Sequence, residues 1–187
     1  MRSQDIAIVG ILLACAAIAR LMANILPTPI VSNLAIGFYC LAIILVAPRI
    51  NEALGIGLVA GIICAMISHS IYPPANLISE PIGVVVCLLV YGLLAKQTRY
   101  AAGTATFLAT CASGFSFLAV ALIMAAPAIA LKYSGMLPFF IAMTPIVLGT
   151  AVVNSIVVGL LTRPALRVIH GSADYIPKSK NNFSKEK

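Results

Sequence analysis

The chain has 187 residues and a formal net charge of +7, but only 9% of its residues are charged and its mean hydropathy is +1.08. About a quarter of an ordinary soluble domain is charged, so this composition excludes a soluble globular protein and predicts one all-α, polytopic membrane domain. The apolar runs are continuous rather than alternating, which excludes a transmembrane β-barrel. The basic residues lie at the ends of these runs and in the tail, a distribution that reflects membrane topology rather than nucleic-acid binding.

Six apolar runs predict six transmembrane helices, because about 20 apolar residues cross the hydrocarbon core. In chain order we expect helices at residues 6–26, 32–47, 53–71, 77–95, 101–131 and 137–162. The first contains Arg20 and lacks a small-residue cleavage site, so it is a retained helix rather than a signal peptide. The second is short for a straight span, and Pro127 should bend or end the fifth. We assign residues 1–166 to the membrane domain and residues 167–187 to a basic cytoplasmic tail.

The distribution of lysine and arginine predicts the orientation of the six helices. With the N-terminus in the cytoplasm, the inner segments carry the basic residues Arg2, Arg49, Lys96, Arg99, Arg163, Arg167 and the lysines of the tail, whereas the outer loops carry Lys132 alone. Since cytoplasmic loops are enriched in basic residues, both termini should be cytoplasmic.

The third run presents small residues at helical spacing, Ala53, Gly57, Gly61 and Ala65, and leads into a polar connection interrupted by prolines. Small residues allow helix backbones to approach closely in a membrane, where no hydrophobic effect drives helices together. A polar break between two apolar runs is where a ligand could meet side chains that do not face lipid. We therefore expect a tightly packed helix that ends in a polar outer loop.

Two charged residues near this loop are candidate ligand contacts. Arg20 is an ionisable residue within a predicted membrane helix, and Asn24 lies one turn further along the same face. The alternative is that Arg20 extends to the outer headgroups. Glu80 could contact a ligand amine or pair with Arg20, or it could simply cap the N-terminus of the fourth helix.

Three further polar residues complete the predicted outer pocket, namely His69, Tyr72 and Asn76. His69 could equally be an interhelical hydrogen-bond donor, and Tyr72, like Tyr39 and Tyr133, could be an interfacial anchor. The predicted substrate-binding set is therefore Arg20, Asn24, His69, Tyr72, Asn76 and Glu80.

The sequence offers no catalytic constellation, so we do not expect an enzyme, a cofactor or a metal. It has neither a nucleophile with an adjacent base nor a phosphate-binding loop, and its glycines are not surrounded by a βαβ unit. The five cysteines all lie inside apolar runs and indicate packing rather than a disulfide framework. Any active transport must draw its energy from a partner or from an ion gradient.

Local sequence patterns resemble a family of membrane subunits. The run LGIGLVAGIICAMIS with its following proline loop, the size of the chain and the six predicted helices resemble the S components of energy-coupling factor (ECF) transporters. Three segments, GLVAGIICAMISHSIYPPAN, ASGFSFL and PIVLGTAVVN, resemble the tryptophan-transport branch of that family. The chain departs from this branch at Ser79-Glu80, where an acidic-then-basic pair is usual, and at Tyr72-Pro73-Pro74, where a Gly-rich loop is usual. A vitamin or another small heterocycle therefore stays open as the substrate.

The resemblance implies a multi-pass subunit of a prokaryotic cytoplasmic membrane that captures a scarce micronutrient from outside. It would act with a transmembrane T component and two ATPase subunits, and would reorient in the bilayer to release the substrate inward. By the same resemblance, Gly10 and Ala14 match the small-xxx-small face that docks on the T component. The alternative for these two residues is packing inside the chain itself. The alternative for the whole protein is a self-sufficient, proton-coupled carrier that uses His69, Arg20 and Glu80.

Overall fold

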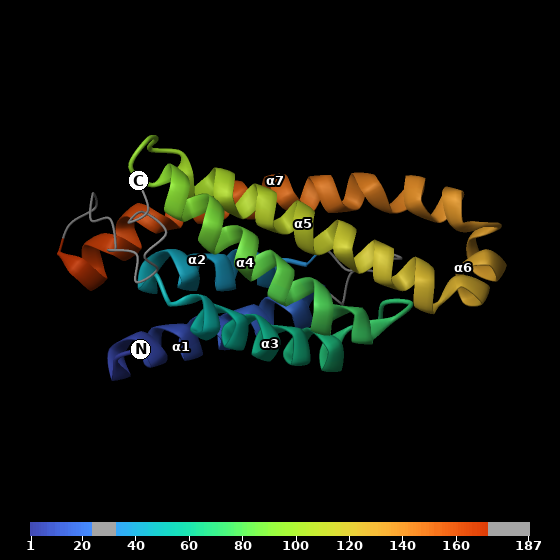
Figure 1. The fold of residues 1–187 in the computed structure, drawn as a ribbon, viewed down its shortest axis with the longest axis horizontal. Coiled ribbons are helices and arrows are strands. Elements are labelled where there is room, and N and C mark those ends of the chain that lie inside the picture. The colour runs from blue at the N-terminus through green and yellow to red at the C-terminus, as the bar shows by residue number, and fades with distance from the viewer. Residues whose placement is uncertain (24–32, 172–187) are drawn as a thin grey trace, which may run out of the picture.

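The computed structural model describes residues 1–23 and 33–171, and the regular structure within these ranges is entirely helical (Figure 1). In chain order the elements are α1 (Ser3–Ala23), α2 (Ala35–Val46), α3 (Ile50–Ile67), the short 3-10 helix η1 (Pro73–Ala75), α4 (Asn76–Leu94), α5 (Ala101–Met124), α6 (Ala126–Tyr133) and α7 (Met136–His170). The predicted all-α class is confirmed.

Five helical segments are long and apolar enough to cross a membrane: α1, α3, η1 with α4, α5 and α7. Their outward surface is apolar, with Ile11 65% exposed on α1 and Leu160 72% exposed on α7. Large contiguous apolar surface of this kind is rare on soluble monomers and suits contact with lipid. The chain is thus a membrane-embedded helical protein.

The second predicted helix, expected at residues 32–47, forms a short helix in the centre of the bundle. α2 has 12 residues, and all of them except Phe38 are buried. At 1.5 Å per residue it is roughly 18 Å long, well short of the ~30 Å hydrocarbon core. It contacts α1, α3, α4, α5 and α7. It ends at Ala47, which adopts the left-handed conformation (φ 45°) before Pro48, a residue that cannot continue the helix.

Proline also decides where the long predicted helix 101–131 breaks. α5 ends at Met124, and α6 begins at Ala126 with Pro127 in its first turn. Proline lacks an N–H and its ring clashes with the carbonyl four residues earlier, so a continuous helix is disfavoured there. The prediction that Pro127 bends or ends this helix is confirmed. α7, by contrast, contains Pro145 and Pro164 without a break and extends past the predicted end at residue 162 to His170.

The third helix was predicted to pack tightly through its small residues, and the structure shows that they pack against α4. A Cβ on Gly57 would lie 2.7 Å from the Cα of Pro81, and a Cβ on Gly61 would lie 2.8 Å from the main-chain oxygen of Asn76. Neither distance leaves room for a side chain. This close contact sets the start of α4, with its polar residues, against the end of α3.

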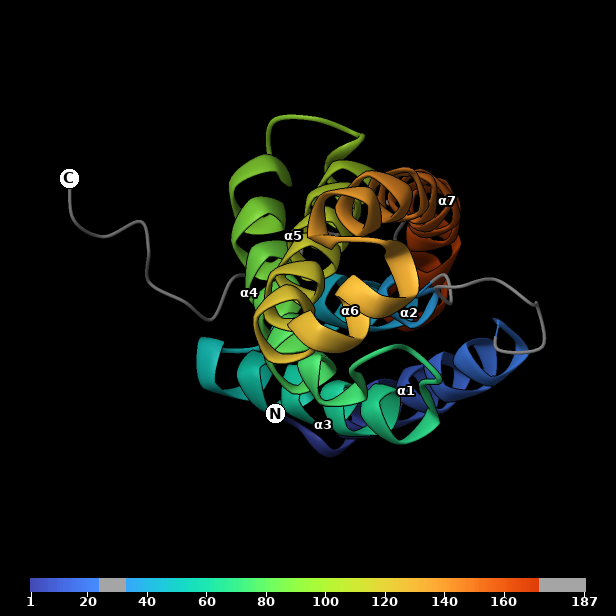
Figure 2. The same cartoon turned by 90° about the vertical axis from the view of Figure 1, so that its right-hand side faces the viewer.

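The connections divide between the two ends of the bundle (Figure 1). One end carries the N-terminus, the α2–α3 and α4–α5 connections and the last turns of α7, while η1, α6 and the turn before α7 lie toward the other end. In the view along the bundle α2 lies inside the ring of longer helices (Figure 2). Basic residues follow the same division, with Arg2, Arg49, Lys96 and Arg99 at the first end and Lys132 at the second.

Candidate functional site

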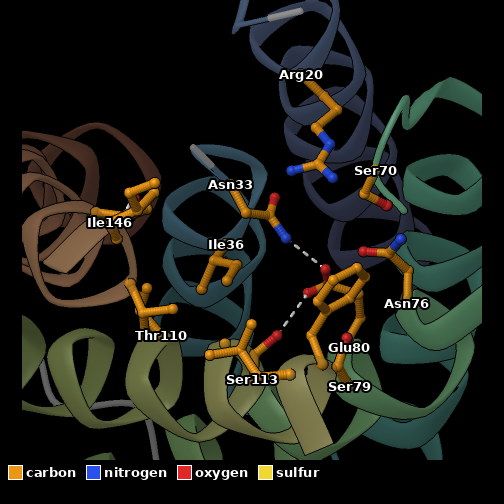
Figure 3. Close-up of a pocket in the computed structure, with 15 residues that line it drawn as sticks. Arg20, Asn33, Ile36, Ser70, Asn76, Ser79, Glu80, Thr110, Ser113 and Ile146 are labelled. Carbon is orange, nitrogen blue, oxygen red and sulfur yellow. Dashed lines mark hydrogen bonds between the residues drawn. The ribbon is translucent and has the colours of Figure 1, made fainter. Parts of the chain in front are cut away.

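A cavity lined by both polar and apolar side chains lies within the bundle, between the last turns of α1, the start of α2 and the facing parts of α4, α5 and α7 (Figure 3). The volume of the cavity, measured as the space open to the centres of water-sized molecules, is about 50 Å³. This volume is several times what one buried water molecule needs. Its lining residues are Arg20, Asn33, Ile36, Ser70, Asn76, Ser79, Glu80, Thr110, Ser113, Gly114, Phe117, Leu118, Ile146, Val147 and Thr150. The lining therefore combines a cation and an anion with further polar and apolar side chains.

Glu80 is the anion of the cavity, and its side chain is completely buried. The Asn33 amide donates a hydrogen bond to Oε1. The Tyr39 hydroxyl donates to Oε2 at 2.8 Å, and the Ser113 hydroxyl donates to the same oxygen at 3.3 Å. The two carboxylate oxygens offer about four acceptor positions, and these donors take three of them. The carboxylate thus holds together the start of α2, the middle of α2 and α5.

Arg20 is the cation of the cavity and is 3% exposed. Its guanidinium donates a hydrogen bond to the Ser68 hydroxyl at 3.1 Å, and Ser68 in turn donates to the Ser70 hydroxyl at 2.8 Å. Figure 3 shows the guanidinium directed toward Asn33 and Ser70, into the protein. This burial does not fit the alternative in which Arg20 extends to the headgroups. Arg20 instead ties the end of α1 to the α3–α4 connection, at the cavity.

The start of α2 is held from the opposite side by Asn154 of α7. The Asn154 amide donates to the main-chain oxygen of Asn33 at 3.1 Å and to the Thr110 hydroxyl at 3.4 Å. Gly37 allows this contact, because a Cβ there would lie 3.2 Å from the Asn154 side-chain oxygen. Backbone groups inside a membrane bundle need such partners, since no bulk water is present to satisfy them.

Ser79 is the one cavity hydroxyl whose hydrogen-bonding capacity is unused among the described residues. Its side chain is 1% exposed, and its Oγ has no hydrogen-bond partner within the described part of the chain. Buried polar atoms are rarely left in this state, and each such atom calls for an explanation such as a water or a ligand. Asn76 differs, because its amide donates to the Pro73 carbonyl at 2.7 Å and so closes the turn before α4.

Three of the predicted binding residues line the cavity, namely Arg20, Asn76 and Glu80. His69 is exposed in the connection after α3, and Tyr72 is half-buried against the apolar cluster of α5, α6 and α7. Neither of these two residues lines the cavity. Both lie in the connection between the end of α3 at Ile67 and the start of η1 at Pro73. Asn24 lies outside the described residues.

The two predicted docking residues lie on the outer face of α1. Both Gly10 and Ala14 are exposed, and a Cβ on Gly10 would meet no atom within 4 Å. The alternative in which this small pair packs inside the chain is therefore not what the structure shows. The face is open to lipid or to another helix.

Several residues that line the cavity or hold its lining residues were not predicted from the sequence. Asn33 was assigned to no role, and Tyr39, expected as an interfacial anchor, is instead fully buried and bonded to Glu80. On α5, Thr106, Thr110 and Ser113 recur every three or four residues, so they share one helix face. That polar stripe within an apolar run was the available signal for the α5 side of the site.

The arrangement suits reversible binding of a small polar molecule. Among the described residues no group of three or more His, Cys, Asp or Glu side chains could hold a metal ion. The charged groups of the cavity are held by hydroxyls and amides, and α5 and α7 add apolar side chains together with Thr110 and Thr150. No model of a known protein family matches the chain, and neither a curated protein nor a solved structure does. The cavity is therefore the feature from which a function can be inferred.

Proposed function

We propose that the protein is the substrate-capture subunit of an importer, and that its cavity binds a small molecule inside the membrane. The observation that supports this most directly is the buried pair of charged residues, Arg20 and Glu80, in one cavity of a lipid-embedded bundle. Ionisable groups at membrane depth are costly and are typically found at substrate or ion sites. An apolar wall with a few convergent polar groups is also the usual composition of small-molecule sites.

In this proposal both termini face the cytoplasm. The short helix α2 is counted with the five long helical segments, which gives six membrane segments. The clustering of basic residues at one end of the bundle supports that orientation, since cytoplasmic segments are enriched in lysine and arginine. The cavity then opens toward the external side, and the membrane is the cytoplasmic membrane of a prokaryote.

The proposed importer is of the ECF type, with this chain as the S component that works with a T component and two ATPases. Two observations support it: the sequence resemblance in helix α3 and the exposed small pair Gly10 and Ala14 on α1. Small residues on a lipid-facing helix permit close approach of a partner helix. The substrate would be a vitamin or a related small heterocycle, with tryptophan among the candidates.

The docking claim is tested by Ala14→Trp, with Leu160→Trp on the exposed face of α7 as the matched control. Overpacking a close helix contact costs about 1–3 kcal/mol. We expect Ala14→Trp to abolish co-purification with the T component and ATP-dependent uptake, while the isolated protein binds its ligand as before. Leu160→Trp should retain all three properties. Loss of ligand binding in Ala14→Trp, or normal uptake by it, would contradict the docking claim.

The capture claim is tested by identifying, with mass spectrometry, the small molecule that co-purifies with the protein. Arg20→Ala and Glu80→Ala should then each weaken its binding by about ten- to a hundredfold, because each removes a charge-assisted hydrogen bond. Binding at wild-type affinity in both variants would place the site elsewhere.

A second candidate function is a proton-coupled carrier that needs no ATPase. The observation that favours it is Glu80 itself, a buried carboxyl in a hydrogen-bonded network of a membrane protein, as in many proton relays. The predicted partner His69 is exposed and does not belong to that network. Uptake in cells without T component and ATPases, abolished by a protonophore, would establish the carrier and refute the ATP-coupled importer.

A further inference from the structure

Among the described residues that line the cavity, the charges sum to zero. Arg20 contributes one positive charge and Glu80 one negative charge, and the other described lining residues are not Lys, Arg, Asp, Glu or His. Both charged side chains are at least 97% buried, and the helices around them face lipid. A net charge in such surroundings is strongly disfavoured, because little solvent is present to stabilise it. A ligand that brings an unbalanced charge would therefore bind poorly.

The two charges come from different elements, Arg20 from α1 and Glu80 from α4, and Figure 3 shows the Asn33 side chain between them. Arg20 places a guanidinium cation at the cavity, and a guanidinium binds anionic groups through charge-assisted hydrogen bonds. Glu80 places its carboxylate oxygens at the cavity, and such oxygens accept hydrogen bonds from an N–H or ammonium group. α5 and α7 add the apolar side chains of Phe117, Leu118, Ile146 and Val147.

We propose that the ligand is a small zwitterion with a short apolar portion, whose anionic group meets Arg20 and whose cationic group meets Glu80. Its apolar portion contacts the apolar side chains of α5 and α7. Its polar end forms a hydrogen bond with the Ser79 hydroxyl, which has no partner among the described residues. This inference rests on the proposed function, since it names the chemical class of the captured substrate.

The test uses the full-length protein in lipid nanodiscs and calorimetric binding of the proteinogenic amino acids, each offered singly. For the tightest binder, the deaminated and the decarboxylated analogues are then measured, which keep the side chain but carry a single charge. We expect the zwitterion to bind about ten- to a hundredfold more tightly than either analogue, because each analogue lacks one charge-assisted contact. If no amino acid binds, or if either analogue binds as tightly as the zwitterion, the inference is wrong.

Two charge-removing variants provide a sharper outcome. In Arg20→Gln the cavity has a net charge of −1, so the decarboxylated, cationic analogue should become the preferred ligand. In Glu80→Gln the net charge is +1, and the deaminated, anionic analogue should be preferred. A residue with a purely structural role would weaken all three ligands alike and would not reverse the order. Unchanged preference in both folded variants contradicts the proposal.

Ser79→Ala tests the same site without disturbing the fold, because the lost hydroxyl has no protein partner among the described residues. The thermal stability of the unliganded protein should be unchanged, and zwitterion affinity should fall roughly two- to tenfold. Equal affinity would remove Ser79 from the proposal. The charge of the co-purified molecule separates the zwitterion inference from the capture function. If that molecule carries a net charge, the zwitterion inference fails while the capture function stands.

Discussion

Gly83 on α4 packs directly against Tyr39 and Ser113, two residues of the candidate site. A Cβ at this residue would lie 2.6 Å from the Tyr39 hydroxyl oxygen and 3.0 Å from the Cβ of Ser113. Both neighbours are donors to Glu80. Gly83→Ala should therefore push α4 away from α2 and α5, and should displace the Tyr39 hydroxyl from the Glu80 carboxylate.

The expected magnitude combines three effects. Overpacking costs about 1–3 kcal/mol, and losing a hydrogen bond to a charged group costs about 1.5–3 kcal/mol. Replacing glycine by alanine within a helix returns up to about 1 kcal/mol. The net loss should be roughly 2–5 kcal/mol. A Cβ on Gly92, which lies on the same helix, would meet no atom within 4 Å, so Gly92→Ala should be neutral or slightly stabilising.

The assay is thermal unfolding in detergent, with ligand affinity measured on the same samples. A double-mutant cycle with Tyr39→Phe isolates the clash, because phenylalanine lacks the oxygen that an alanine at position 83 would strike. Tyr39→Phe alone should destabilise the protein, yet adding Gly83→Ala to it should cost clearly less than in the wild type. If the two effects simply add, or if Gly83→Ala is as stable as Gly92→Ala, the argument from the Tyr39–Glu80 contact is refuted.

Three further predictions address the cavity wall, the support of α2 and the topology. Gly114→Ala would place a Cβ 2.6 Å from a methyl of Val147, so it should weaken ligand binding and lower stability by about 1–3 kcal/mol, whereas Gly149→Ala, which meets nothing within 4 Å, should do neither in the same assays. Asn154→Ala removes the donor to the main-chain oxygen at the start of α2, and thermal unfolding should show a loss of about 1–3 kcal/mol; an unchanged Tm would contradict that support role. In a cysteine-free background, Ser134→Cys should react with an impermeant maleimide from outside intact cells and Gln97→Cys only after lysis; the reverse pattern would invert the orientation.

The helical architecture could be predicted from hydropathy and proline positions because both act locally. The break at Pro127 agrees with the missing N–H and the ring of proline, although Pro145 and Pro164 lie inside the continuous α7. The spacing of Gly57 and Gly61 predicts a tightly packed helix, and the structure shows that its partner is α4. What hydropathy did not reveal is that α2 is buried on nearly all sides. A short apolar run has the same composition whether it faces lipid or protein, so only the packing of the other helices decides its place.

Residues of the candidate site could be predicted from the sequence only where a charged side chain lies in or beside an apolar segment. Arg20 and Glu80 stand out because charges are costly in a membrane. Asn33, Tyr39 and Ser113 do not stand out, since a tyrosine or serine in an apolar run is common and can face lipid headgroups or a neighbouring helix. Their role depends on the approach of α2 and α5 to α4, a tertiary feature that spacing within one helix does not encode.

The cavity lies where the short helix α2 begins, so the length of α2 and the position of the cavity are linked. α2 ends at the connection to α3 at the basic end of the bundle, and its 12 residues reach roughly 18 Å inward from there. In the proposed topology its N-terminal end lies at membrane depth, where backbone that is not helical is tolerated only inside protein or beside a cavity. Asn154 satisfies the main chain of Asn33, and the Asn33 side chain in turn serves Glu80. A full-length second helix would carry apolar residues through this position, so the polar site exists because the helix stops within the bundle.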